Sequence, residues 1–249
     1  MSRLGIIDWG IGGVSIYKLI KERIGDVPVT YFSDTGVTPY GKMTRGELVS
    51  RLNAVIGYLK SEGLTRLVIG CNAASTAIDL LETEGVKIEG MIESGVTAAM
   101  KNRPSRLGLI GGRRTVISGA YRKAFKEKGI AVEQRIAQPL SGLIESGDIG
   151  SSELRCEAEK ILSPIRNCSH ILLACTHYPA ISNVLRDFVS DETRFIDPSF
   201  ELVSRVKKWN LPSGGKDIFL TSGNAMKMKK AALNAFGVVI ENTKQINIR

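Results

Sequence analysis

The stretches LVIGCNAAS (residues 67–75) and LLACTHYP (residues 172–179) each carry a run of apolar residues directly into a cysteine and a polar loop. The two cysteines, Cys71 and Cys175, are 104 residues apart. A similar offset of 103 residues aligns LGIIDWG, which starts at Leu4, with LGLIGGR, which starts at Leu107. The chain therefore repeats one pattern, and we expect two similar units that each deliver one thiol.

Short apolar runs alternate with helical patterns along nearly the whole chain, which is typical of α/β proteins with mainly parallel sheets. Thr44 and Glu47 form a capping box that predicts a helix beginning there and ending near Gly63. The expected strands are 4–7, 29–32 and 66–70 in the first half and 106–112, 132–137 and 170–176 in the second.

The predicted fold class is α/β, with two similar, pseudo-twofold-related domains and an active site in the cleft between them. Open parallel sheets bind ligands at the carboxyl ends of their strands, which is where Asp8, Asp34, Cys71 and Cys175 fall. The pattern alone leaves open which unit takes a further strand and helix near the end of the chain. We set the expected domain bounds at 1–95 plus 207–249 for the first domain and 96–206 for the second.

The composition is typical of a packed globular protein, since 43% of the 249 residues are hydrophobic. No apolar run reaches the roughly 18 residues that a membrane-spanning helix requires, and no signal peptide is visible, so we expect a cytoplasmic protein without a membrane partner. The formal charge of +9 favours a solvated basic surface over a nucleic-acid partner, because the basic residues lack interleaved aromatic residues. A homodimer is compatible with the sequence.

The four cysteines are expected to be free thiols, because the cytosol keeps thiols reduced. A structural zinc site needs closely spaced ligand pairs. Cys168 and Cys175 are too far apart for such a pair, and His170 and His177 are the sole histidines. We therefore expect no metal and no other cofactor.

The segment DWGIGG (residues 8–13) allows two interpretations. Its glycines could bring the backbone close to a phosphate, and Asp34 lies near the distance expected for a ribose-binding acid. The dinucleotide fingerprint, however, needs a third glycine where this chain has Ser15. A tight turn between strand and helix explains Gly12 and Gly13 equally well.

Two opposed thiols suit one kind of chemistry particularly well. One thiolate can remove a proton from a tetrahedral carbon while a thiol on the opposite face returns one, which inverts that centre. A single acid–base residue would return the proton to the face it came from. The pair therefore predicts racemisation, with Asp8 and His177 as partners that tune Cys71 and Cys175.

Several motifs resemble those of the glutamate racemases, within the cofactor-independent aspartate/glutamate racemase superfamily. The resemblance runs nearly end to end and depends above all on the two cysteine boxes. The matching segments are DWGIGG, DTGVTPYG, GCNAAS, ACTHYP, PLSGLIESG with Glu145, and FIDPS with Asp197.

The resemblance implies two α/β domains and an enzyme, active in peptidoglycan biosynthesis, that interconverts L- and D-glutamate without pyridoxal phosphate or metal. It implies Cys71 and Cys175 as the acid–base residues, with Asp8 assisting Cys71, and His177 and Glu145 assisting Cys175. The substrate-binding residues that it implies are Pro39, Tyr40, Gly41, Asn72, Thr115 and Thr176.

Three positions depart from the family pattern, and each departure removes a hydroxyl from the expected pocket. Trp9 replaces a serine, Ala73 replaces a threonine, and Gly112 stands where a further threonine is common. We count Trp9 and Ala73 among the pocket residues. The losses leave open a racemase of aspartate or another amino acid, or a binding protein of the same fold without catalysis.

Trp9 generates a first prediction, because an indole beside Asp8 narrows or flattens the pocket. We expect Trp9→Ser to shift the ratio of kcat/KM between glutamate and less polar amino acids towards glutamate, by about 10- to 200-fold for one contact. The measurement compares that ratio in the wild type and the variant. An unchanged ratio of kcat/KM would show that Trp9 does not determine which amino acid the protein prefers.

Overall fold

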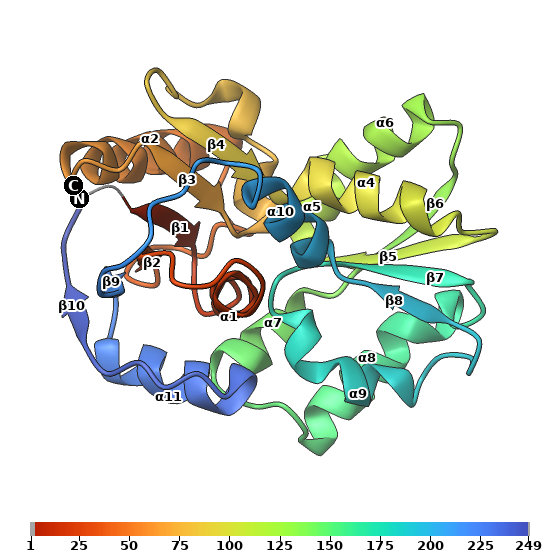
Figure 1. Cartoon of the computed structure of the whole chain (residues 1–249). Coiled ribbons are helices and arrows are strands. Elements are labelled where there is room, and N and C mark those ends of the chain that lie inside the picture. Colours follow the sequence, from red (N-terminus) through yellow and green to blue (C-terminus); the bar gives the residue numbers. More distant parts are fainter. Residues whose placement is uncertain (1–2, 249) are drawn as a thin grey trace.

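The computed structural model describes residues 3–248, which form two parallel β-sheets flanked by helices (Figure 1). The larger sheet has the strand order β10-β9-β2-β1-β3-β4, and the smaller sheet has the order β6-β5-β7-β8. Every strand pair among the described residues is parallel. The expected α/β class with mainly parallel sheets is therefore confirmed.

The strands of the six-stranded sheet are β1 (Leu4–Asp8), β2 (Val29–Ser33), β3 (Arg66–Ile69), β4 (Lys87–Gly90), β9 (Ile218–Thr221) and β10 (Thr243–Gln245). Those of the four-stranded sheet are β5 (Leu107–Gly111), β6 (Val132–Ile136), β7 (His170–Ala174) and β8 (Arg194–Ile196). The α-helices are α1 (Val14–Arg23), α2 (Arg45–Ser61), α3 (Asn72–Ser75), α4 (Met91–Asn102), α5 (Arg113–Ile117), α6 (Ala120–Glu127), α7 (Gln138–Glu145), α8 (Ser152–Leu162), α9 (Ser182–Arg186), α10 (Pro198–Val206) and α11 (Ala225–Phe236). Three short 3-10 helices are η1 (Ile78–Leu80), η2 (Ser163–Ile165) and η3 (Tyr178–Ile181).

The repeat seen in the sequence is also a repeat of topology. The order β2-β1-β3-β4 in the larger sheet recurs as β6-β5-β7-β8 in the smaller one. β5 begins 103 residues after β1, and β7 begins 104 residues after β3. The strand β9 pairs with β2 and β10 pairs with β9, so the strands near the end of the chain extend the first sheet, with α11 between them in the sequence. We keep the division into 1–95 plus 207–249 and 96–206 as a proposal.

Each sheet separates two apolar layers, because successive strand residues point to opposite faces. In the larger sheet Ile6 and Tyr31 pack towards α1, α10 and α11, whereas Ile7 and Phe32 pack towards α2. In the smaller sheet Ile110 packs towards α7 and α8, and Leu109 packs towards α4 and α6. Burying one such side chain is worth about 1.5–3 kcal/mol relative to leaving it exposed. These layers fix both sheets and hence the loops at their carboxyl ends.

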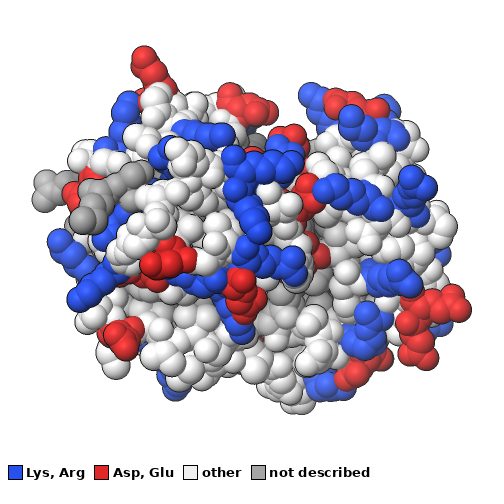
Figure 2. All heavy atoms as spheres, in the orientation of Figure 1, with Lys and Arg blue, Asp and Glu red and all other residues white. Residues whose placement is uncertain are grey.

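Charged and uncharged residues both lie at the surface of the molecule. On the face shown in Figure 2, lysine and arginine side chains lie over both sheets and are interspersed with acidic and uncharged ones. Among residues 3–248, no helix combines the length and the apolar character needed to span a lipid bilayer.

A buried ion pair anchors the loop that follows β2. Arg51 of α2 donates from Nε to Asp34 Oδ2 over 2.8 Å and from one terminal nitrogen to Oδ1 over 2.7 Å. The hydroxyls of Tyr40 and Ser222 also donate to this carboxylate, each over 2.7 Å. Asp34 is fully buried and its carboxylate is fully engaged, so a role in binding a ribose is not available to it. A dinucleotide site at DWGIGG would therefore lack the ribose-binding acid for which Asp34 was the candidate.

We expect Arg51→Met to destabilise the fold by about 3–5 kcal/mol, because it leaves the Asp34 carboxylate buried without its cation. Urea unfolding followed by circular dichroism measures the change. Arg106→Gln is the matched control, since it breaks the solvent-exposed pair with Glu133 and should have a far smaller effect. Equal losses in the two variants would contradict the assignment of Asp34 and Arg51 as an anchor.

Candidate active site

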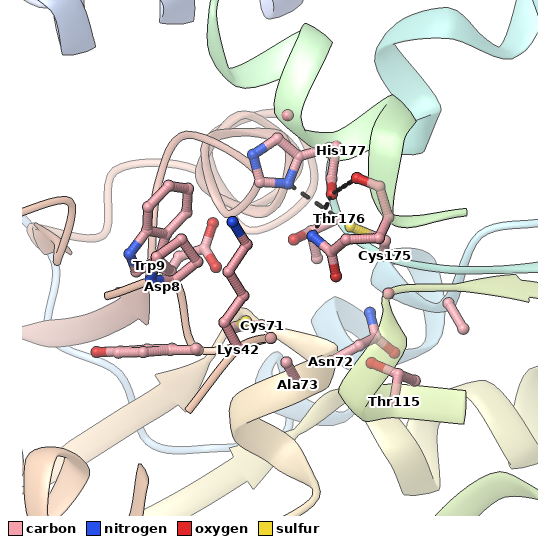
Figure 3. A pocket seen from close by; sticks show the side chains of 18 of the residues that line it. Asp8, Trp9, Lys42, Cys71, Asn72, Ala73, Thr115, Cys175, Thr176 and His177 are labelled. Carbon is pink, nitrogen blue, oxygen red and sulfur yellow. Dashed lines mark hydrogen bonds between the residues drawn. The ribbon is translucent and has the colours of Figure 1, made fainter. Parts of the chain in front are cut away.

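One cavity of about 400 Å³ opens between the carboxyl ends of the two sheets (Figure 3). Asp8 ends β1, Cys71 follows β3 by two residues, and Cys175 directly follows β7. The cavity is lined by Asp8, Trp9, Pro39, Tyr40, Gly41, Lys42, Cys71, Asn72, Ala73, Gly112, Thr115, Gln138, Pro139, Ser141, Gly142, Ala174, Cys175, Thr176 and His177. All the residues expected from the sequence to touch substrate therefore meet in one place, and Glu145 lies behind His177.

The first thiol has a carboxylate as its neighbour. Asp8 Oδ2 accepts a hydrogen bond of 2.8 Å from the Gly13 amide, which fixes the carboxyl group at the start of the loop. Burial raises the pKa of Asp8, and the charge of His177 offsets only part of this effect. Burial also raises the pKa of the Cys71 thiol, and the negative charge of Asp8 raises it further. Both groups therefore hold protons more tightly than they would in water.

The second thiol has an imidazole as its neighbour. Cys175 Sγ lies 3.6 Å from His177 Nδ1, and His177 Nε2 lies 2.7 Å from Glu145 Oε2. Burial alone would lower the pKa of His177, but its interactions with Cys175 and Glu145 outweigh burial and raise it well above the usual value. A charged imidazolium beside a cysteine favours the thiolate. The two cysteines thus sit in chemically different environments.

The loop from residue 10 to residue 13 makes contact with the second cysteine's partners. The Ile11 amide donates to Glu145 Oε2 over 2.9 Å. A Cβ on Gly10 would lie 2.0 Å from the same oxygen, and a Cβ on Gly12 would lie 2.4 Å from Thr176 Oγ1. A side chain at either position would therefore displace Glu145 or Thr176 from its place between the two halves. The sequence interpretation, which invoked a tight turn or a phosphate, missed this reason.

Asn72 presents a polar group to the cavity beside Cys71. Its Oδ1 accepts a 2.8 Å hydrogen bond from the Tyr121 hydroxyl, which holds the side chain in place. Its Nδ2 is buried and has no hydrogen-bond partner among residues 3–248. An unpaired buried donor is costly, so Asn72 Nδ2 is suited to bind an oxygen of a ligand.

Trp9 forms an apolar wall. Its Nε1 donates to the Val37 carbonyl over 3.1 Å, so the indole N–H is already used inside the protein. Ala73 and Gly112 also line the cavity without offering a side-chain donor. The three hydroxyls expected from the family pattern are therefore absent from the pocket lining, and the indole does not replace them.

Asp197, the acidic residue of the FIDPS motif, is not among the cavity-lining residues. It caps α10, where its Oδ1 accepts a hydrogen bond from the Ser199 amide over 2.8 Å. The sequence analysis missed Lys42, Gln138 and Ser141, which do line the cavity. Lys42 directly follows the Pro-Tyr-Gly segment, so its position next to a motif was the available signal. No cluster of three or more potential metal ligands occurs within residues 3–248.

The chain is similar to known proteins in both sequence and fold. The family model described as Asp/Glu/Hydantoin racemase matches residues 4–206. A glutamate racemase from Aquifex aeolicus is 32% identical over 225 residues, covering 88% of each chain. The solved structure of a glutamate racemase from Aquifex pyrophilus has a TM-score of 0.81 at 28% identity and covers 97% of both chains. That of Francisella tularensis glutamate racemase with D-glutamate has a TM-score of 0.89 at 21% identity, covering 99% of this chain and 98% of that one.

The pair of His177 and Glu145 leads to a prediction about proton binding. We expect Glu145→Gln to lower the pKa of His177, because the amide keeps the shape of the side chain and removes its charge. The raised pKa stabilises the fold at low pH, and this contribution is lost as the pH rises through the folded-state pKa. The free energy of unfolding of the variant should therefore fall more at pH values below the wild-type pKa of His177 than at pH values above it.

NMR titration of the imidazole protons measures this change directly. The chain has only two histidines, and His170 begins β7 at the end of the strand remote from Cys175. The His170 titration serves as an internal control and should not move. An unchanged His177 titration would show that Glu145 does not charge the imidazole.

Proposed function

Because the chain belongs to the Asp/Glu/Hydantoin racemase family, we propose that it interconverts L- and D-glutamate by proton transfer between Cys71, Cys175 and the substrate α-carbon. The observation that carries this proposal is the entry of two free thiols into one cavity from the ends of different sheets, each with its own acid–base partner. A cavity with one such thiol could exchange a proton on one face only.

The protonation states suggested by the two environments suit this reaction. His177, held charged by Glu145, lies beside Cys175, which in this proposal removes the α-proton. Cys71, whose thiol keeps its proton because of burial and Asp8, donates that proton to the opposite face. After one turnover the two cysteines have exchanged protonation states, and the same groups then act in the reverse direction.

Asn72 and the threonines provide the contacts for the α-carboxylate in this proposal. The unpartnered Asn72 Nδ2 lies next to Cys71 in the lining, and Thr115 and Thr176 line the same cavity. Binding of the carboxylate there would satisfy the buried amide and place the α-carbon between the two thiols. Glutamate as substrate is supported by the activity of the Aquifex relatives, each at least 28% identical to this chain.

Cys71→Ser and Cys175→Ser should each lower racemisation by at least about 100-fold, the low end of what a positioned acid or base contributes. Each variant should retain α-proton abstraction from one enantiomer, and the two variants should prefer opposite enantiomers. The assay incubates enantiopure amino acids in D2O and follows both deuterium at the α-carbon and optical rotation.

Cys156→Ser is the matched control, because Cys156 is an exposed free thiol on α8 outside the cavity. It should racemise at the wild-type rate. Near-normal racemisation by either active-site variant would refute the two-thiol mechanism. A panel that includes aspartate and neutral amino acids identifies the substrate, and wild-type protein that exchanges no α-proton from any of them would refute a racemase.

A further inference from the structure

Lys42, which lines the candidate active site and is exposed to solvent, places a positive charge there. It follows Gly41 in the loop after β2, where its own amide donates to the Pro39 carbonyl over 2.7 Å in a tight turn. In Figure 3 its side chain extends between Asp8 and Thr176, with the amino group directed into the pocket. Among residues 3–248 no hydrogen bond or ion pair engages this amino group, although most other charges near the cavity are paired.

The carboxylates near the cavity are held by other groups, which leaves the Lys42 ammonium group available for an anion of a ligand. Asp8 is held by the Gly13 amide, and Glu145 by His177 and the Ile11 amide. Neither carboxylate forms an ion pair with Lys42 within the distance of a salt bridge. An unpaired ammonium group in a cleft of this kind attracts an anionic group of a ligand.

The pocket has fewer side-chain hydroxyl groups than the family pattern leads us to expect, and Lys42 is the lysine in its lining. Trp9, Ala73 and Gly112 line the pocket at positions where the family resemblance led us to expect hydroxyl groups, and the indole N–H already donates to the Val37 carbonyl. Asn72, beside Cys71, has a free donor for a carboxylate close to the reacting carbon. Lys42 reaches the cavity from a different loop on a long flexible stem, so it can meet the far end of the same ligand.

We propose that Lys42 is a specificity-determining residue that selects acidic amino acids by pairing with their side-chain carboxylate, in place of the missing hydroxyls. The substrate class in this inference rests on the proposed racemase function. Its physical basis, a lysine in the cavity lining without a partner among the described residues, does not. A contact made equally in the bound substrate and in the transition state changes KM and leaves kcat unchanged.

The test compares D-glutamate with its uncharged isostere D-glutamine in the wild type, Lys42→Met and Lys42→Arg. Kinetics give kcat and KM, and titrations followed by NMR give dissociation constants that do not depend on turnover. Lys42→Met should raise both KM and the dissociation constant for glutamate by about 10- to 100-fold, the loss expected for a charge-assisted hydrogen bond, and change kcat little. The constants for glutamine should change less than about 3-fold, and Lys42→Arg should retain most of the affinity for glutamate.

Lys126→Met is the matched control, because Lys126 is an exposed lysine in the last turn of α6, outside the cavity. It should leave all constants unchanged. If Lys42→Met weakens the binding of glutamate and glutamine equally, Lys42 contacts the α-carboxylate and the proposal is overturned. Unchanged affinity for glutamate in Lys42→Met would also overturn the proposal. A wild type that binds glutamate more tightly than glutamine through Lys42 but exchanges no α-proton would refute the racemase and leave this inference standing. A wild type that does not bind glutamate would overturn both.

Discussion

A single carboxylate joins the two halves of the candidate active site. Glu145 Oε2 accepts from the Ile11 amide of the loop after β1 and from His177 Nε2 of the loop after β7. Two hydrogen bonds to one oxygen, from opposite sheets, fix how closely the halves approach. Gly10 and Gly12 permit this approach, because a Cβ at either position would overlap with Glu145 or Thr176. The two cysteine-bearing halves are thus joined at the site by an interaction that involves neither cysteine.

The same loop also orders the environment of the first thiol. Gly13, one residue beyond the second of these glycines, donates to Asp8 and holds its carboxyl group near Cys71. A short run of backbone therefore presents one amide to each side of the cavity. This arrangement explains how a duplicated fold, with the same strand order in both sheets, carries two thiols with different partners. The duplication supplies the positions of the thiols, and the loop contacts supply their chemistry.

The features predicted correctly from the sequence depend on local pattern. The strands β1, β3 and β7, which lead to Asp8, Cys71 and Cys175, follow from apolar runs and an internal repeat, and the capping box at Thr44 is present as expected. The resemblance to the racemase superfamily is confirmed by the family match over residues 4–206. The short strands β4, β8 and β10 were not predicted, and β10 has no apolar run of its own and forms by pairing with β9.

Other features depend on contacts between distant parts of the chain. The function of Asp34 as a buried partner of Arg51, and of Asp197 as a helix cap, became clear only from the packing around each residue. Lys42 was overlooked because charge next to a motif does not show which way a flexible side chain extends. The roles of Gly10 and Gly12 depend on residues more than a hundred positions away. Sequence motifs thus indicate which residues carry functional groups, whereas the contacts that hold those groups in place are seen only in the folded structure.

The unlike surroundings of Cys71 and Cys175 have a thermodynamic consequence for any reaction between mirror-image molecules. Free enantiomers in water have equal free energies, so the overall equilibrium constant is unity and the values of kcat/KM in the two directions must be the same. An imidazole behind one thiol and a carboxyl group behind the other can therefore alter the two directions only in compensating ways. A lower KM for one enantiomer must be matched by a proportionally lower kcat for it. The asymmetry of the site therefore affects kcat and KM separately, while kcat/KM stays equal for the two enantiomers.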